Sequence, residues 1–119
     1  MTKDELIRRT QGFALRVIRL VEALPNGTTG SVLGKQLLRC GTSVGANYRA
    51  ACRAKSKADF INKLKIVEEE CDESIYWMDL IVAAKLVSKP QIKLLSQEAN
   101  ELLSIVVAAI RTTRANRKS

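Results

Sequence analysis

Apolar residues recur every three or four positions along four long segments, and this spacing constrains the fold more than any other feature of the chain. Residues three or four apart lie on one face of an α-helix, so each segment predicts an amphipathic helix. The repeated positions are Leu6, Phe13, Val17, Leu20, Val21 and Leu24; Leu33, Leu37, Cys40, Val44, Tyr48 and Ala51; Phe60, Leu64, Val67, Cys71, Ser74, Met78 and Ile81; and Ile92, Leu95, Ala99, Leu102, Val106 and Ala109. No segment alternates as a strand does and the connections are short. We therefore expect an all-α, antiparallel up-down-up-down four-helix bundle that forms one domain over residues 1–119.

Capping and turn residues define the expected helix ends. The expected helices span residues 3–24, 30–53, 57–86 and 89–113, and a basic C-terminal tail follows over residues 114–119. Thr2 with Glu5, and Ser56 with Asp59, have the spacing of N-terminal caps, while Pro90 fits the first turn of a helix. The chain is long enough to bury a modest core without disulfide bonds.

Gly41 and Gly45 lie inside the second expected helix, where a glycine costs about 1 kcal/mol relative to alanine. A phosphate-binding P-loop needs a preceding strand and a Gly-Lys-Ser/Thr ending, and the sequence "GTSVGAN" has neither. The apolar periodicity passes through both glycines without a change of phase. We therefore expect a continuous helix whose glycines flank the core face and allow a neighbouring helix to approach closely.

Basic residues outnumber acidic ones by 20 to 12, and the net charge of +8 favours polyanionic partners. The second helix carries a basic stripe of a single sign, and the first helix adds arginines opposite its core face. The expected nucleic-acid contacts are Lys35, Arg39, Arg49, Arg53, Lys55 and Lys57, supported by Arg8, Arg16 and Arg19. The alternative is a solvated surface that only keeps the chain soluble. Because few aromatic residues are available to stack on bases, we expect phosphate contacts with little sequence preference.

The acidic run "EEECDE" over residues 68–73 raises the possibility of acid–base or metal chemistry. Its carboxylates spread around the helix instead of converging, and the chain contains no histidine to act as a base or ligand. Cys40, Cys52 and Cys71 lack the spacing of a metal site and are expected to pack as small apolar residues. We therefore expect no enzymatic activity, no cofactor and no metal.

The third helix carries a second apolar face, away from its core positions. Ile66, Tyr76, Trp77 and Leu80 form this face, and Ile105 departs similarly from the core of the fourth helix. Tyrosine and tryptophan are enriched at protein interfaces, so we expect a homo-oligomer that buries this face. The alternative is that Trp77 covers an edge of the core of its own chain. If the acids of this helix meet the basic stripe of a neighbouring copy, fewer cations remain for nucleic acid.

The chain shows no sign of membrane insertion or export. No apolar run approaches the roughly 18 residues of a spanning helix. The first residues, "MTKDELIRR", carry charge and lack the apolar core of a signal peptide. We therefore expect a cytoplasmic protein that does not associate with membranes.

A specific run of polar residues within residues 36–81 goes beyond generic bundle patterning. Arg39, Ser43, Val44 and Asn47 in "RCGTSVGAN" are followed by Ser-x-x-Asp-Phe in "SKADF". This combination resembles the small bacterial four-helix-bundle family named after open reading frames in the intervening sequences of 23S rRNA genes. The shared positions are Gln36, Leu37, Arg39, Ser43, Val44, Asn47, Ser56, Asp59, Phe60, Leu64, Glu73 and Leu80. With compatible helices on either side, the resemblance covers nearly the whole chain.

The resemblance implies a bundle that assembles into a homopentameric ring, and no enzymatic activity is attached to the family. It also implies kinship with the accessory variability protein of diversity-generating retroelements, a basic ring thought to engage nucleic acid and a reverse transcriptase. A scaffold for such a protein partner is therefore the alternative to direct nucleic-acid binding. Gly41, Ser43, Gly45 and Asn47 are expected to be structural, with Asn47 forming a buried hydrogen bond to a neighbouring helix.

Overall fold

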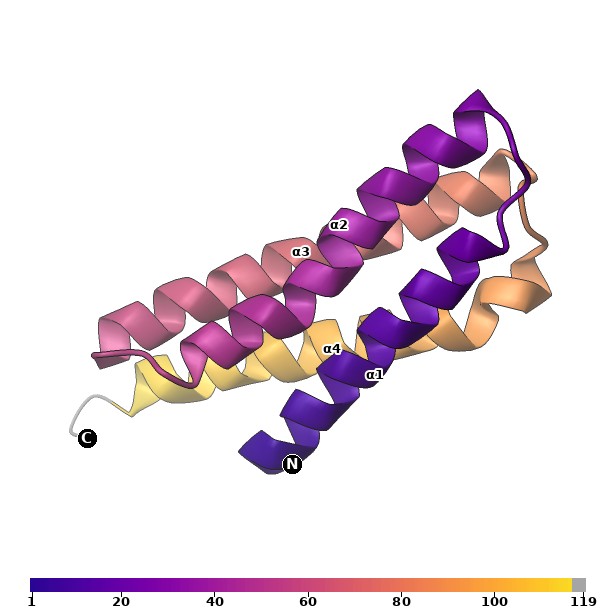
Figure 1. Ribbon diagram of the computed structural model, residues 1–119. Coiled ribbons are helices and arrows are strands. Elements are labelled where there is room, and N and C mark those ends of the chain that lie inside the picture. The colour runs from indigo at the N-terminus through magenta and orange to yellow at the C-terminus, as the bar shows by residue number, and fades with distance from the viewer. Residues whose placement is uncertain (117–119) are drawn as a thin grey trace.

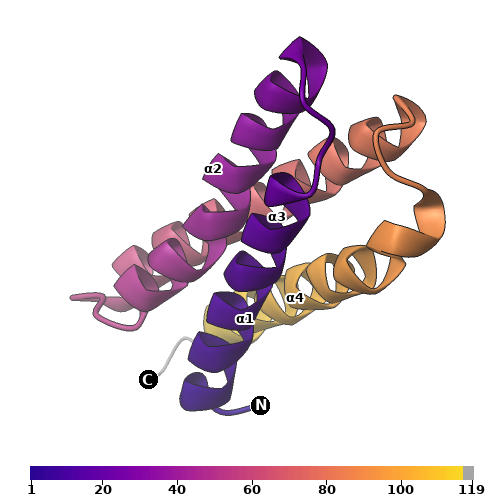
Figure 2. The ribbon, with the colours of Figure 1, turned by 45° about the vertical axis from the view of Figure 1, so that its right-hand side comes forward.

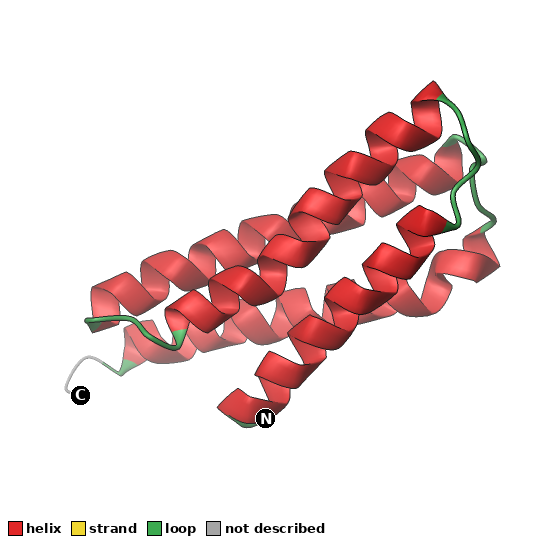
Figure 3. Ribbon diagram, viewed as in Figure 1, coloured by secondary structure: helices red, strands yellow, loops and turns green. Residues whose placement is uncertain are grey.

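Four α-helices make up most of residues 1–116, the part of the chain that the computed structural model describes. They are α1 (Lys3–Glu22), α2 (Thr28–Ala51), α3 (Lys57–Ala83) and α4 (Lys89–Ala115). Figure 3 shows helices joined by loops, without a strand in the described part. The expected all-α four-helix bundle is therefore confirmed, and successive helices run in opposite directions in Figure 1.

The bundle is an elongated rod of 52 × 22 × 20 Å in which each helix packs against two neighbours. The α1/α2, α2/α3 and α3/α4 pairs pack extensively, whereas α1 and α4 contact each other much less. The diagonal pairs do not pack directly, as expected when four helices stand at the corners of a square. Figures 1 and 2 both show that α1 lies beside α2. They also show that α3 extends along the full length of the rod.

The apolar repeats form the core that the sequence predicts. The fully buried large side chains include Phe13, Leu37, Leu64, Met78 and Leu102, one or more from every helix. The assignments differ at the margins of the core. Thr10 and Ile110 are also buried, whereas five expected core positions are partly exposed: Leu20, Val21, Leu33, Phe60 and Ala109.

Side-chain caps begin three of the helices. The Glu5 N–H donates to Thr2 Oγ1 at 3.1 Å, and the Asp59 N–H donates to Ser56 Oγ at 3.1 Å. At the start of α4, the Ser88 N–H donates to the Gln91 side chain at 2.7 Å. These bonds satisfy backbone groups that have no partner within the helix. The α2 helix instead begins after Gly27, whose φ of 140° strongly favours glycine.

Three of the expected helix ends were two or three residues too long. The α1, α2 and α3 helices end at Glu22, Ala51 and Ala83 instead of at residues 24, 53 and 86. The α2 helix begins at Thr28, two residues before the expected position. The α4 helix continues to Ala115 and includes Arg114, so the basic tail expected from residue 114 was placed too early. Residues 117–119 of that expected tail lie outside the described residues.

The end of α3 has a physical cause that the sequence conceals. Lys85 has a φ of 63°, in the left-handed region, and this stops the helix. The Lys85 N–H donates to the Val82 carbonyl at 2.9 Å, and the Leu86 N–H donates to the Ile81 carbonyl at 3.1 Å. This is the hydrogen-bond pattern of a Schellman motif. The position that Lys85 occupies in the motif is usually a glycine.

The expected role of the α2 glycines is confirmed by their neighbours on α1. A Cβ atom at Gly41 would lie 2.9 Å from the Val17 methyl carbons. A Cβ atom at Gly45 would lie 3.2 Å from Thr10 Oγ1 and 3.4 Å from the Thr10 carbonyl carbon. The α1 and α2 helices can therefore approach each other closely because α2 lacks side chains at these positions.

Candidate nucleic-acid and subunit interfaces

The basic stripe of α2 lies on the solvent side of the helix, next to α1. Lys35 and Arg49 of α2 are exposed, as is Arg53 just after the end of the helix, and none of the three forms an ion pair within residues 1–116. Both Arg49 and Lys35 line the surface between α1 and α2, toward opposite ends of that seam. These cations are therefore free to bind an anion outside the chain.

The arginines of α1 extend the positive surface. Arg8 and Arg19 are exposed, Arg16 is half-buried, and within the described chain none of the three pairs with a carboxylate. Leu15, 47% exposed, lies four residues before Arg19 on the same outer side of the helix. The expected supporting contacts thus form a second unpaired basic surface on α1.

Arg39 differs from the rest of the stripe because it bridges α2 and α3. Its guanidinium lies 3.4 Å from Glu70 Oε2 and 3.1 Å from Glu73 Oε1. The hydrogen bond to Glu73 raises the pKa of Arg39 above its usual value. Burial raises the pKa of Glu70, and the charge of Arg39 opposes that change. A phosphate that binds Arg39 must therefore compete with two carboxylates of the same chain.

Lys55 lies in the turn between α2 and α3, and Lys57 is the first residue of α3. The Lys55 backbone N–H donates to Asp59 Oδ2 at 3.1 Å, and Lys57 Nζ donates to the backbone carbonyl of Asn116. Hydrogen bonds from Lys63 and from the Lys55 backbone lower the pKa of Asp59. The Lys57 ammonium is therefore held within the chain, whereas the Lys55 ammonium forms no ion pair within residues 1–116 and stays available to an anion.

An ion pair between α1 and α4 was not predicted from the sequence. Arg9 Nη2 lies 2.5 Å from Glu98 Oε1 and 3.0 Å from Glu101 Oε1, and Arg9 Nε donates to Glu98 Oε2 at 3.0 Å. It connects the two neighbouring helices that pack least extensively. The sequence feature that could have indicated this ion pair is the three-residue spacing of Glu98 and Glu101, which places both carboxylates on one face of a helix.

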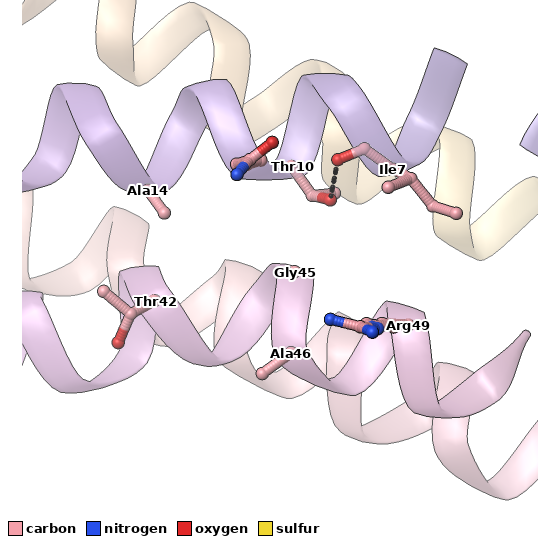
Figure 4. Close-up of a pocket in the computed structure, with 8 residues that line it drawn as sticks. Ile7, Thr10, Ala14, Thr42, Gly45, Ala46 and Arg49 are labelled. Atoms are coloured by element: carbon pink, nitrogen blue, oxygen red, sulfur yellow. Dashed lines mark hydrogen bonds between the residues drawn. The ribbon is translucent and has the colours of Figure 1, made fainter. Parts of the chain in front are cut away.

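A groove of about 340 Å³ runs between α1 and α2 on the solvent side (Figure 4). Thr10 of α1 lies across from Gly45 of α2, while Ile7 lies across from Arg49 near one end and Ala14 across from Thr42 near the other. The Thr10 hydroxyl donates to the Ile7 carbonyl at 3.0 Å, so it is satisfied within its own helix. The groove combines a small apolar lining with one unpaired cation.

The second apolar face of α3 is partly open to solvent. Ile66 is 40% exposed and Tyr76 is 58% exposed, whereas Trp77 and Leu80 are half-buried. The Tyr76 and Trp77 rings meet edge to face, with centroids 5.0 Å apart and an interplanar angle of 78°. The Trp77 indole nitrogen is buried without an acceptor in the described chain. Trp77 therefore both covers the core edge and supports the exposed ring of Tyr76.

Ile105 lies apart from these four residues. It follows Glu98 and Glu101 by seven and four residues on α4, so it shares the side of α4 that meets Arg9 of α1. The structure thus groups four of the expected interface residues on α3 and places Ile105 at another seam.

The expected hydrogen bond from Asn47 to a neighbouring helix was wrong. Asn47 Nδ2 donates to the Ser43 carbonyl at 2.9 Å, and Ser43 Oγ donates to the Arg39 carbonyl at 2.7 Å. Both bonds stay within α2, because a short polar side chain reaches the carbonyl one turn earlier more easily than it reaches another helix. Ser43 and Asn47 therefore satisfy these hydrogen-bond donors on one face of α2, without a bond to another helix.

The cysteines pack largely as expected. Cys40 and Cys71 are buried and Cys52 is half-buried, and all three are free thiols. Ser74 Oγ lies 3.3 Å from Cys40 Sγ across the α2/α3 seam. Burial raises the pKa of Cys40, and it raises the pKa of Cys71 to about 12. The two buried thiols are therefore inert at neutral pH.

Residues 1–116 hold neither a cluster of metal-ligating side chains nor a membrane-spanning helix. This part of the chain contains no group of three or more Cys, Asp or Glu residues arranged to hold a metal ion. None of its four helices is both long enough and apolar enough to cross a membrane.

Comparison with known proteins connects this arrangement to a family. The family model for the 23S rRNA-intervening sequence protein matches residues 2–108, which include α1 to α3 and most of α4. The chain belongs to this family. The resemblance carried by the run around Arg39 and Asn47 is thereby confirmed.

A solved structure related to this family has the same architecture. It is a protein of unknown function from the S23 ribosomal protein family of Bacteroides thetaiotaomicron. It shares 34% sequence identity with this chain and covers 93% of it and 99% of its own length, with a TM-score of 0.87. No functionally curated protein matches the chain. The fold of this 23S rRNA-intervening sequence family member is therefore shared along nearly its whole length.

Proposed function

We propose that this protein is a non-enzymatic, ring-forming helical bundle of the cytoplasm that binds RNA or DNA mainly through phosphates. The observation that supports this most directly is the division among its cations. Arg9 and Arg39 are paired with carboxylates of α4 and α3, whereas Arg8, Arg19 and Arg53 are exposed and unpaired within residues 1–116. Unpaired surface cations attract a polyanion without first breaking an internal ion pair.

The chemistry of the surface favours contacts to the backbone of the nucleic acid. Arginine and lysine contacts to phosphate position a protein without reading sequence. Of the five aromatic residues, Phe13 and Tyr48 are buried and Tyr76 lies on the acidic helix α3. The basic surface therefore lacks the aromatic platforms that bind single-stranded bases by stacking.

A salt series with two ligands tests this function. The chain, freed of bound nucleic acid with nuclease, is titrated with a structured RNA and with duplex DNA. We expect the logarithm of affinity to fall linearly with the logarithm of salt, similarly for both ligands. No binding at low salt contradicts the proposal.

Charge reversal locates the binding surface. The triple variant with Arg8→Glu, Arg19→Glu and Arg53→Glu removes three unpaired exposed cations. We expect weaker binding and a salt slope reduced by about one for each cation that contacts a phosphate. A matched control reverses Lys85, Lys89 and Lys93, which are exposed around the start of α4. Equal losses in both triple variants contradict a specific basic surface and indicate a response to net charge alone.

A scaffold role for a protein partner is the second candidate, with no direct nucleic-acid role. The partner would be a nucleic-acid enzyme such as a reverse transcriptase. The exposed Tyr76 and Ile66 on α3 favour this candidate, because apolar and aromatic surface of this kind is typical of protein interfaces. The same salt series separates the two functions, since a pure scaffold leaves both nucleic acids unbound.

A further inference from the structure

Two surfaces of the chain carry opposite charges but cannot meet within one copy. The first is the α1/α2 groove, with Ala14, Gly45 and Ala46 in its lining and Arg49 near its end. The second is the α3 face around Tyr76. Because the groove lies between α1 and α2 while the face lies on α3, the chain cannot place its own Tyr76 in its own groove.

The α3 face is acidic around its aromatic residues. Glu69, Asp72 and Glu73 precede Tyr76 by seven, four and three residues, so they share its side of the helix. Glu69 and Asp72 are exposed and form no ion pair within residues 1–116. The face thus presents an aromatic ring flanked by unpaired carboxylates.

The α1/α2 groove carries the opposite charge. Arg49 lines it and is unpaired in the described chain, and the same wall of α2 carries the unpaired Lys35 toward its other end. The small residues of the groove leave room for a side chain that projects from outside. An aromatic residue supplies a large contact area at low conformational cost, and the edge-to-face contact with Trp77 already orients Tyr76.

We propose that the α1/α2 groove of one copy receives the Tyr76 face of α3 from a second copy. The carboxylates beside Tyr76 then approach Arg49 of the receiving copy. This inference rests on the self-association proposed above and names the two surfaces that carry it. It commits the groove to a second copy of this chain instead of a nucleic acid, because Arg49 is the one charged residue in a lining that is otherwise neutral.

The contact joins two different surfaces, so it is heterologous. Each copy therefore offers one free groove and one free face, and successive copies build a closed ring or an open filament. The ring-forming assembly proposed above corresponds to the closed case.

In the proposed contact, one cation binds the neighbouring copy, while other cations remain available to nucleic acid. Arg49 faces the carboxylates of the neighbouring copy, whereas Arg8, Arg19 and Arg53 lie outside the groove lining. The nucleic-acid test above uses only these outer arginines. Failure of nucleic-acid binding and failure of this contact can therefore be observed separately.

Two complementary variants test the contact. Tyr76→Glu removes the aromatic ring and adds charge to the face, while its groove stays intact. Ala46→Glu fills the groove and places a carboxylate one turn from Arg49, while its face stays intact. Both positions are exposed, so both variants should fold. Circular dichroism and the melting temperature verify this before the mass in solution is measured by light scattering.

We expect the wild-type chain to be an oligomer and each variant alone to be a monomer. An equimolar mixture should contain pairs with one copy of each variant, because one intact groove meets one intact face. The mixture is measured at the highest soluble concentration, since a pair has one interface and lacks the added stability of a closed ring. Leu94→Glu and Ala108→Glu, at exposed positions on α4, are controls that should remain oligomeric.

Three results overturn the proposal. A monomeric wild-type chain excludes self-association altogether. An Ala46→Glu variant that stays oligomeric shows that the groove is not used, and the face then pairs with another surface. Two monomeric variants that fail to pair in the mixture exclude a contact between groove and face.

Discussion

Gly41 of α2 faces Val17 of α1 so closely that an added Cβ atom would lie 2.9 Å from both Val17 methyl carbons. Heavy atoms of packed side chains normally stay at about 3.5–4.0 Å. The distance between α1 and α2 is therefore limited at this point by the absence of a side chain. The same seam borders the groove proposed to receive a second copy.

The first prediction is that Gly41→Ala lowers the free energy of unfolding by about 1 kcal/mol. Overpacking costs about 1–3 kcal/mol and exceeds the gain of about 1 kcal/mol in helix propensity. Urea denaturation measures the change. Gly12→Ala in α1 is the matched control, because no atom lies within 4 Å of the added Cβ, and it should stabilise the chain by up to about 1 kcal/mol.

A double-mutant cycle tests the cause of this loss. If Val17 is the obstacle, Val17→Ala and Gly41→Ala together should cost less than the sum of their separate effects. Additive costs, or a Gly41→Ala variant as stable as Gly12→Ala, would contradict the packing argument.

The core and the role of the glycines could be predicted because both follow from helical periodicity. Leu37 and Leu64 are buried where the three-four spacing puts them, and Gly41 faces a neighbouring helix because the phase of the repeat is unbroken there. Tyr76 was assigned to a second face by the same reasoning. Periodicity reports the direction in which a side chain points, and these predictions needed nothing else.

Ion pairs between different helices could not be predicted from the sequence, because they depend on how the helices are rotated and shifted along their axes relative to one another. The bond from Arg9 to Glu98 joins residues 89 positions apart. Arg39 was expected to contact nucleic acid, and its pairing with Glu70 and Glu73 was not foreseen, because it depends on how α3 approaches that edge of α2. The prediction for Asn47 was wrong for a different reason, because the hydrogen-bond acceptor of its side chain lies on α2 itself.

The second prediction is that Lys85→Gly raises the free energy of unfolding by about 1 kcal/mol. The left-handed conformation costs a residue with a Cβ about 1–2 kcal/mol, and glycine avoids that cost, although it loses more entropy on folding. Thermal or urea denaturation measures the gain. Lys85→Ala is the control, because it also removes the charge but keeps the Cβ and should leave stability nearly unchanged. Equal effects of the two substitutions would assign the change to the lost charge.

The third prediction concerns the ion pair between α1 and α4. Arg9→Met keeps much of the side-chain stem but leaves Glu98, whose side chain is only 17% exposed, without its cation. We expect a loss of about 1–2 kcal/mol, between the values for exposed and buried ion pairs. The loss should shrink as salt rises, because partial exposure permits screening.

Arg8→Met is the control for this substitution, since Arg8 is the neighbouring exposed arginine without an ion pair in the described chain. Its effect should stay within about 0.5 kcal/mol. If both variants lose the same stability, the attachment of α1 to α4 does not depend on the carboxylates of α4.

The fourth prediction concerns the reactivity of the three thiols. A thiol reagent at about pH 8 should modify the half-buried Cys52 first, because Cys40 and Cys71 are buried and their pKa values are raised. Peptide mass spectrometry after timed labelling identifies the modified residue. Denaturant should make all three thiols react at similar rates, and early modification of Cys71 in the native chain would contradict its burial.

The same burial gives the chain a dependence on alkaline pH. The pKa of Cys71 is about 12 in the folded chain against an ordinary value of 9.0, so the unfolded chain releases this proton first as the pH rises. The unfolded state then binds fewer protons than the folded state, and stability falls between about pH 9 and pH 12. Cys71→Ala removes this contribution but creates a small cavity. The variant should therefore be less stable than the wild type at about pH 8, and the difference should narrow at about pH 10.5.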